Sequence, residues 1–240
     1  GDEHLFQAIN EYATISDWLL ENFFANEQKR LSEFVVTNAS DVTYNGKSLP
    51  LDLIPSSPRL RKTERELIYE LTAKKYSMEA LQGQVGRRLR DDFNLLKSDY
   101  DVIICDCPPG ISVMTESVLA ASHLIIVPTI PDFMSTLGLD LFTGDIMQNL
   151  RDRDIESLPV VLATRYDDTP HQKVVLQAMR EAANSKEAEF EMFNTVIPLR
   201  TGFASNPIEL GPDPTLAAKW PGEALGIIDK LLKEVQERLK

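Results

Sequence analysis

The most constraining stretch of the sequence is an apolar run that ends in one carboxylate and then in two prolines. It reads Tyr100-Asp101-Val102-Ile103-Ile104-Cys105-Asp106-Cys107-Pro108-Pro109-Gly110. A short apolar run bounded by chain breakers predicts a strand that is buried on both faces, as in the parallel sheets of α/β proteins. The run therefore predicts an α/β sheet with Asp106 at the carboxyl end of a strand, where open sheets of this class bind ligands.

The position of Asp106 suits a metal ligand. Mg²⁺ keeps several of its waters and is usually held by one or two carboxylates together with substrate phosphates. The end of a rigid strand would fix such a carboxylate. The alternative is that Asp106 caps the helix or turn that follows it.

The rest of the chain alternates between helical and strand patterns. Strands are predicted near residues 101–106, 124–128, 159–164 and 193–197, and helices over 5–35, 61–97, 114–122, 135–151, 171–183 and 223–239. Thr14 and Asp17 form a capping-box pattern in the first of these helices. Alternation of this kind predicts parallel pairing through right-handed crossovers. We expect a single α/β domain over residues 1–240, built as three layers around a mostly parallel sheet.

Four blocks of the sequence resemble the ParA/MinD family of deviant-Walker ATPases. The first is residues 100–128, where the Asp106 strand and the two prolines are followed by a helix and a second apolar strand. The other blocks are 53–67, 160–167 and 196–200. Their order and spacing together carry the resemblance, which covers the chain from about residue 50 to its end.

The resemblance implies a function and a set of site residues. It implies a P-loop NTPase-like fold and a plasmid or chromosome partitioning ATPase that works as a Mg·ATP-dependent switch. Asp106 would hold Mg²⁺ as the catalytic and metal residue, and Pro108, Pro109 and Gly110 would form the nucleotide-sensing loop. Thr164, Arg165, Pro198, Leu199 and Arg200 match places where family members approach the nucleotide base, although Thr164 and Arg165 stand where many relatives carry an asparagine.

The family's glycine- and lysine-rich phosphate loop has no counterpart in these 240 residues. The one Gly-Lys-Ser, at Gly46, follows Asn45 between two alternating segments, and this pattern is typical of a hairpin turn. We expect the chain to be an ATPase that lacks its first strand-helix unit at the N-terminus, so that it neither hydrolyses ATP nor binds it tightly alone. A protein that lost the loop and kept the fold as a non-catalytic interaction scaffold is the alternative.

Charge is unevenly distributed along the chain. The formal net charge is −12, yet residues 59–90 contain nine basic and four acidic residues. Arg87, Arg88 and Arg90 are the densest group and are our candidates for contacts with DNA phosphates. The alternative is a solvated helical face with ion pairs along the helix.

Partners and location follow from the resemblance and from what the sequence lacks. The family implies a ParB-like partner, DNA bound without sequence preference, and a homodimer in the ATP-bound state. The predicted final helix, 223–239, has mixed charge and no aromatic residue, which disfavours a MinD-type regulator that binds membranes. Cys105 and Cys107 are too few for a structural zinc site and are expected to pack as small apolar groups. We expect a cytoplasmic protein with no membrane contact.

Overall fold

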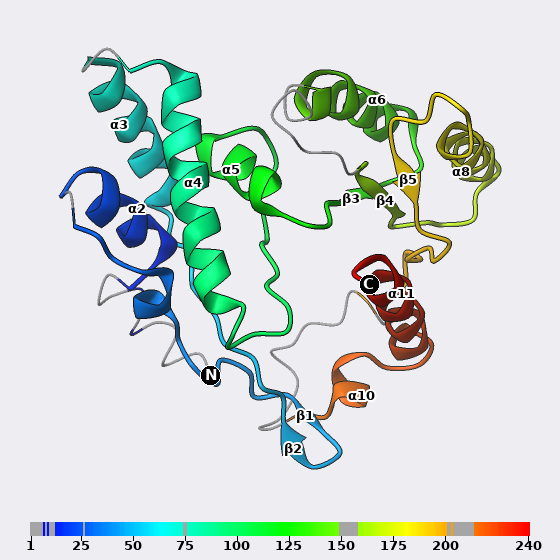
Figure 1. Cartoon of the computed structure of the whole chain (residues 1–240). Helices are drawn as coiled ribbons and strands as arrows, with labels where there is room; N and C mark the ends of the chain where they lie inside the picture. Colours follow the sequence, from blue (N-terminus) through cyan, green and yellow to red (C-terminus); the bar gives the residue numbers. More distant parts are fainter. Residues whose placement is uncertain are drawn as a thin grey trace. The chain divides into compact units, whose positions relative to one another are not determined.

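The computed structural model describes residues 7, 9, 13–25, 27–73, 76–148, 158–200, 203 and 214–240. The chain divides into two compact units, residues 1–121 and residues 122–240 (Figure 1). The prediction of one domain over the whole chain stays a prediction.

Unit 1 is mainly helical. Its elements are α2 (Ile15–Phe23), the 3₁₀ helix η1 (Leu31–Phe34), β1 (Thr43–Tyr44), β2 (Lys47–Ser48), α3 (Leu60–Ala73), α4 (Met78–Leu96) and α5 (Val113–Ala121). The predicted capping box is confirmed, because the side chain of Asp17 accepts hydrogen bonds from the backbone N–H and the hydroxyl of Thr14. The long helix expected over 5–35 is shorter among the described residues. α2 ends at Phe23, and the side chain of Asn22 in its last turn donates to the carbonyl oxygens of Trp18 and Lys29.

The core of unit 1 lies between its helices. Trp18, Leu67, Val85, Leu89 and Val113 come from four different helices and are almost fully buried. α4 runs along α5 (Figure 1), and the two helices approach closely where a Cβ on Gly86 would lie 3.8 Å from Ser117 Oγ. Burial of this apolar face is what stabilises the helices of unit 1.

The two short strands of unit 1 confirm the predicted hairpin turn. β1 and β2 pair in antiparallel orientation, with Thr43 opposite Ser48 and Tyr44 opposite Lys47. Asn45 and Gly46 both have positive φ, +51° and +73°, as a two-residue type I′ turn requires. The Gly-Lys-Ser sequence is therefore a turn followed by a strand, and it does not form a phosphate loop.

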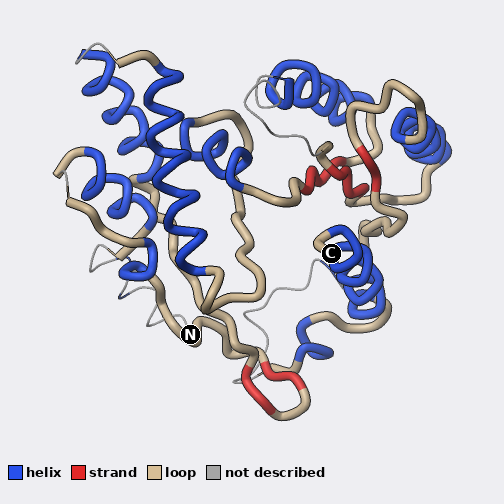
Figure 2. The backbone as a smooth tube through the Cα atoms, in the orientation of Figure 1, coloured by secondary structure: helices blue, strands red, loops and turns tan. Residues whose placement is uncertain are grey.

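Unit 2 contains a parallel sheet of three strands, drawn red in Figure 2 with the short hairpin of unit 1. Its elements are β3 (Ile126–Thr129), α6 (Phe133–Leu141), the π-helix η2 (Phe142–Met147), β4 (Val160–Ala163), α8 (Pro170–Ala183), β5 (Glu191–Met192), α10 (Leu216–Lys219) and α11 (Ala224–Arg238). The strand order is β3-β4-β5, so β3 is an edge strand and β4 is central. All four residues of β4 are buried.

Helices cover both faces of this sheet. Val161 packs with Leu139 of α6 and Met179 of α8, whereas Val160 and Leu162 face the other side and pack with Phe193 and with residues of α11. Alternate residues of a strand point to opposite faces, so β4 divides the two helical layers. The α/β class with a parallel sheet is confirmed, and unit 2 has its helix, sheet and helix layers.

Two predicted strands differ in the structure. Residues 102–107 are neither helix nor strand, because no strand pairs with them within the described part of the chain. The last strand is β5 at Glu191–Met192 and not 193–197. It ends early because the backbone amides of Asn194 and Thr195 donate to the carboxylate of Glu234 on α11 instead of to a neighbouring strand. Among the described helices, none is long and apolar enough to span a membrane.

Candidate functional site

Asp106 lies on an exposed, irregular segment of unit 1. Where a buried strand was expected, Val102 and Ile103 are exposed, and Ile104 is 87% exposed. Exposed, contiguous β-branched residues in an unpaired segment are unusual, since such residues favour a pleated and half-buried surface. The segment has the sequence of a strand, but no strand among the described residues pairs with it.

The loop after Asp106 is shaped by its prolines and its glycine. Pro108, Pro109 and Gly110 are all exposed. Gly110 has a φ of +102°, a conformation that side-chain-bearing residues rarely adopt. Three residues later the chain enters α5, so the loop connects the Asp106 segment directly to a buried helix.

The two cysteines flank Asp106 closely. Cys105 is exposed and Cys107 is half-buried, so the expectation that both pack as small apolar groups is wrong for Cys105. Surrounding protein atoms nevertheless desolvate the Cys105 thiolate and, with Cys107 nearby, raise the pKa of that thiol to about 11. Desolvation and the negative charge of Asp106 raise the pKa of Cys107 as well. Both groups are therefore thiols at neutral pH.

The residues around Asp106 fit a magnesium ion only if the ion arrives with phosphate oxygens. Within the described residues, no group of three or more His, Cys, Asp or Glu side chains lies close enough to hold a metal ion by itself. One accessible carboxylate is nonetheless a sufficient protein ligand for Mg²⁺ when phosphates and water fill the other positions.

Unit 2 brings together the other predicted site residues, those of the base side. Thr164 and Arg165 follow β4, and Pro198 and Leu199 follow β5. The backbone N–H of Tyr166 donates to Ile197 and the N–H of Leu199 donates to Tyr166, which joins the two segments at the carboxyl end of the sheet. Arg165 has a φ of +51°, a conformation that costs a side-chain-bearing residue about 1 kcal/mol and is found disproportionately at functional sites.

Arg200 is held by an ion pair. Its guanidinium lies 2.6 Å from the carboxylate of Glu223, at the residue before α11. Both side chains are mostly exposed, so this pair contributes little to stability. Thr164, Arg165, Pro198, Leu199 and Arg200 thus lie in unit 2, whereas Asp106 and the loop after it belong to unit 1.

Two carboxylates at the same end of the sheet were not predicted from the sequence. Asp132, just after β3, caps α6 by accepting from the N–H of Ser135, and this hydrogen bond holds the pKa of Asp132 below its usual value. Asp168, after β4, accepts from the phenol of Tyr166 and pairs with Lys173 at 3.1 Å, and the pKa of Asp168 is lowered by these two partners. The sequence could have indicated both residues, because each Asp stands shortly before a predicted helix, where Asp is favoured.

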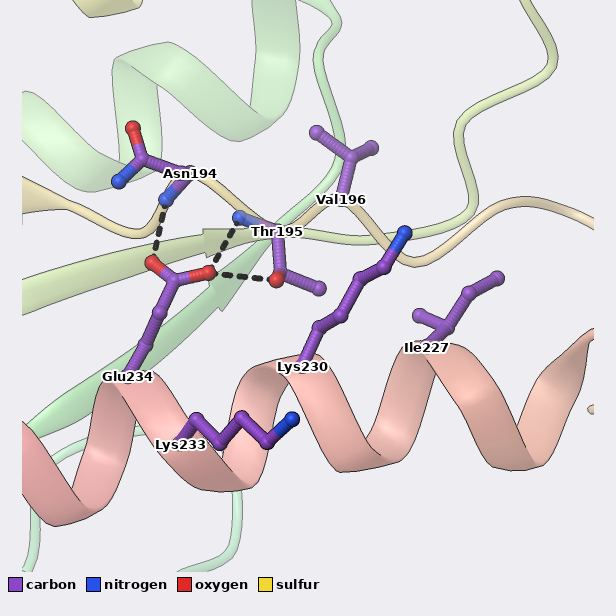
Figure 3. Close-up of a pocket in the computed structure, with 7 residues that line it drawn as sticks. All are labelled: Asn194, Thr195, Val196, Ile227, Lys230, Lys233 and Glu234. Atoms are coloured by element: carbon purple, nitrogen blue, oxygen red, sulfur yellow. Dashed lines mark hydrogen bonds between the residues drawn. The ribbon is translucent and has the colours of Figure 1, made fainter.

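An open groove of about 500 Å³ lies beside residues 194–196, ahead of the predicted base-side residues 198–200 (Figure 3). Val196 and Ile227 give it an apolar wall, and Lys230 and Lys233 of α11 bring two ammonium groups. Glu234, its one carboxylate, points to the backbone amides of Asn194 and Thr195. The lining residues are Asn194, Thr195, Val196, Ile227, Lys230, Lys233 and Glu234.

The three arginines proposed for DNA do not have equal roles. Arg87 and Arg90 lie three residues apart on α4, and both are exposed. The side chain of Arg88 is only 18% exposed; it donates to the carbonyl of Lys29 at 2.7 Å and lies 3.9 Å from Asp92. Arg88 is thus bound within unit 1, and the two exposed arginines are the ones that a phosphate backbone can reach.

Comparisons with known proteins found a family model and relatives that match this chain. A family model described as an AAA domain matches residues 11–158. An uncharacterized protein of Mycobacterium tuberculosis (strain ATCC 25618 / H37Rv) is 29% identical over 185 residues, which make up 76% of this chain and 52% of that protein. Protein SopA of Escherichia coli (strain K12) is 30% identical over 145 residues, 58% of this chain and 36% of SopA.

A third relative is named for chromosome partitioning. Chromosome partitioning protein ParA of Myxococcus xanthus (strain DK1622) is 31% identical over 96 residues, 40% of this chain and 30% of that protein. The chain spans about half the length of the M. tuberculosis relative and about a third of SopA and ParA.

Proposed function

The chain belongs to the ParA-like family of AAA-domain ATPases, and on this premise we propose that it forms the metal-side and base-side parts of a Mg·ATP-dependent switch for plasmid or chromosome partitioning. The observation that carries the proposal is the exposed segment at Asp106, which ends in a glycine-dependent turn and runs directly into α5. This arrangement places one accessible carboxylate next to a loop that can respond to it.

In this proposal Asp106 holds Mg²⁺, through water or directly. The bound ion would neutralise phosphate charge and orient the triphosphate for hydrolysis. Pro108, Pro109 and Gly110 sense the state of the phosphates, since prolines restrict the loop and Gly110 supplies the turn that needs a positive φ.

The base side of the nucleotide is assigned to unit 2. Tyr166, the residue after Arg165, pairs with Pro198 at the carboxyl end of the sheet, the end at which open α/β sheets bind ligands.

In this proposal, a phosphate-loop unit of the family would supply the phosphate-binding groups. Residues 102–106 pair with no strand within the described part of the chain, and β3 is the edge of its own sheet. Each offers unpaired backbone groups to which a further strand can add. A phosphate-loop unit of the family begins with such a strand, so we propose that this unit completes the site.

The partners follow from the family and from the surface. Arg87 and Arg90 are proposed to contact DNA phosphates without reading sequence, because they are exposed on a helix and carry no base-recognition pattern. A ParB-like protein and a second copy of the ATPase in the nucleotide-bound state are the proposed protein partners.

One observation favours a second function. The 240 residues contain no family-type phosphate loop, and the only Gly-Lys-Ser forms a hairpin. A non-catalytic scaffold on the same fold would need neither the loop nor Mg²⁺. The two functions differ in whether Asp106 matters for ATP hydrolysis.

The experiment measures Mg²⁺-dependent ATP hydrolysis in a protein that joins residues 1–240 to a phosphate-loop unit of the family. Asp106→Asn is expected to lower kcat by at least about a hundredfold, as loss of an electrostatic ligand to the reacting phosphates typically does. Asp101→Asn, on the same exposed segment, is the matched control and keeps the wild-type rate. Equal rates in both variants would support the scaffold.

A further inference from the structure

The first turn of α5 takes one of its caps from another helix. Oε1 of Glu64, on α3, accepts a hydrogen bond from the backbone N–H of Met114, with 3.0 Å between the two atoms. Ser112, just before α5, is the N-cap residue. Its hydroxyl accepts from the backbone N–H of Thr115, and its carbonyl accepts the first helical hydrogen bond, from the N–H of Glu116. Because the first N–H groups of a helix have no partner within it, these contacts decide where α5 begins.

Glu64 is placed differently from the charged residues around it. It is only 7% exposed, whereas Arg61, Arg65 and Glu66 on the same helix are exposed. A buried carboxylate is costly unless it is hydrogen-bonded, and the positive end of a helix dipole stabilises it further. The contact with α5 therefore accounts for the inward position of Glu64.

The start of α5 is also the downstream end of the Asp106 segment. At the upstream end, the phenol of Tyr100 donates to Asp52 at 2.7 Å and the Tyr100 amide donates to Leu96. Between these two anchors, residues 102–111 have neither helix nor strand structure, and nearly all of them are exposed. The segment is thus held at both ends by unit 1.

We propose that Glu64 is a positioning residue for the loop Pro108-Pro109-Gly110. By fixing the N–H of Met114, it holds the downstream end of the loop still, so that the loop moves only between Tyr100 and Ser112 when a metal-bound phosphate is near Asp106. This inference rests on the proposed function, which gives the loop a nucleotide to sense. Glu64 touches neither metal nor nucleotide and acts through α5.

Cysteine labelling in the 240-residue chain tests the anchor without nucleotide. Cys105 and Cys107 are the only cysteines, so reaction with a thiol reagent reports on this segment alone. Glu64→Ala is expected to raise the labelling rate of the half-buried Cys107 about tenfold, because one buried hydrogen bond holds the start of α5. Ser112→Ala, which removes the neighbouring cap, shifts the rate in the same direction.

Two further variants separate the hydrogen bond from general packing. Glu64→Gln keeps a carbonyl oxygen at the same position and is expected to restore a rate within about twofold of the wild type. Glu66→Ala, which removes only an exposed ion pair with Lys62, is the matched control. A wild-type rate in Glu64→Ala, or a rate in Glu64→Gln as fast as in Glu64→Ala, would overturn the proposal. So would a loss of global stability in urea large enough to explain the faster labelling.

The same variants in the phosphate-loop-containing protein test the link to the reaction. Glu64→Ala is expected to lower kcat with KM for Mg·ATP unchanged, and Glu64→Gln to restore kcat. An unchanged kcat in Glu64→Ala would overturn the positioning role. If Asp106→Asn leaves hydrolysis intact, the proposed function fails instead, and the labelling rates still decide whether Glu64 anchors the loop.

Discussion

The indole Nε1 of Trp18 donates a hydrogen bond to Oδ2 of Asp92, with 3.0 Å between the two atoms. The same carboxylate accepts from the backbone N–H of Leu31 and from the guanidinium of Arg30, and it lies 3.9 Å from Arg88. Asp92 is 1% exposed and joins α2, η1 and α4. One buried carboxylate thus holds together three helices of unit 1, including α4, which precedes the Asp106 segment.

Removing this carboxylate is expected to destabilise unit 1. In Asp92→Ala the indole of Trp18 and the amide of Leu31 lose their partner inside the core, and the charge of Arg88 loses its compensation. Such changes together cost about 3 kcal/mol or more. Urea unfolding followed by far-UV circular dichroism measures the change. The exposed neighbour Asp91→Ala should stay within about 0.5 kcal/mol of wild type, and equal stability of the two variants would contradict the role of Asp92.

The upstream anchor of the Asp106 segment should be visible in a tyrosine titration. The hydrogen bond and the negative charge of Asp52 raise the pKa of Tyr100. The contribution of this contact to stability is therefore fully present below the unfolded tyrosine pKa, about 10, and is lost as pH rises through the higher folded value. Spectrophotometric titration should show Tyr100 ionising at a higher pH than most of the six tyrosines, and Asp52→Asn should lower that pH.

Controls for that titration are available in the chain. Tyr100→Phe removes one of two late-ionising groups and leaves Tyr166, whose pKa is also raised, by its hydrogen bond to Asp168. Tyr69→Phe removes a tyrosine that is 68% exposed. If the curve of Asp52→Asn overlays the wild-type curve, Tyr100 is not held by Asp52 in solution.

DNA binding should depend on Arg87 and Arg90. Replacing both with glutamate is expected to weaken binding to duplexes of any sequence and to reduce the slope of log Kobs against log salt by about one for each phosphate that the protein no longer neutralises. Arg180→Glu with Lys186→Glu, both exposed in unit 2, makes the same charge change elsewhere. Fluorescence anisotropy at several salt concentrations measures both quantities, and equal weakening in the two double variants would indicate only a net-charge effect.

Docking of α11 should weaken in acid. Burial alone would raise the pKa of Glu234, but hydrogen bonds from Thr195 and Asn194 outweigh it and hold the pKa below its usual value. The stabilising contribution is therefore present above the unfolded glutamate pKa, about 4.3, and is lost as pH falls through the lower folded value. Glu234→Ala should lower the unfolding free energy by about 1 to 2 kcal/mol at pH 7.

The same comparison of unfolding free energies is then made at low pH. The difference between wild type and Glu234→Ala should shrink by pH 3, while the exposed Glu237→Ala stays close to wild type at both values. A difference that is as large at pH 3 as at pH 7 would show that poorer packing, and not removal of the charged carboxylate, causes the effect.

Local signals in the sequence predicted much of the fold. Three features could be predicted because they depend on residues close in sequence. They are the Asn45-Gly46 turn, the Thr14 capping box and the strand at 160–163. The strand at 101–106 could not be judged in this way. Its pattern is correct for a strand, but strand formation depends on a pairing partner that the pattern does not specify.

In the candidate site, too, the features that were not predicted depend on residues far away in the sequence. The resemblance assigned residues 164–165 and 198–200 to the nucleotide base. The structure joins these two segments in unit 2, and their contact with a nucleotide stays a prediction. The inward position of Glu64 was not predicted, because its spacing fits a solvated face and only α5, fifty residues later, makes its burial favourable. The different role of Arg88 likewise depends on contacts with distant residues.

The most direct test of the proposed division of the site is a calorimetric titration of Mg·ATP into the 240-residue chain. In the proposed function, this chain supplies the metal and base sides of the site, and a unit outside it supplies the phosphate-binding groups. A triphosphate without backbone amides and lysines to neutralise its charge should not bind tightly. The predicted result is no heat of binding at micromolar concentrations, and a Kd in the low micromolar range would contradict the proposed division by showing a phosphate site within these residues.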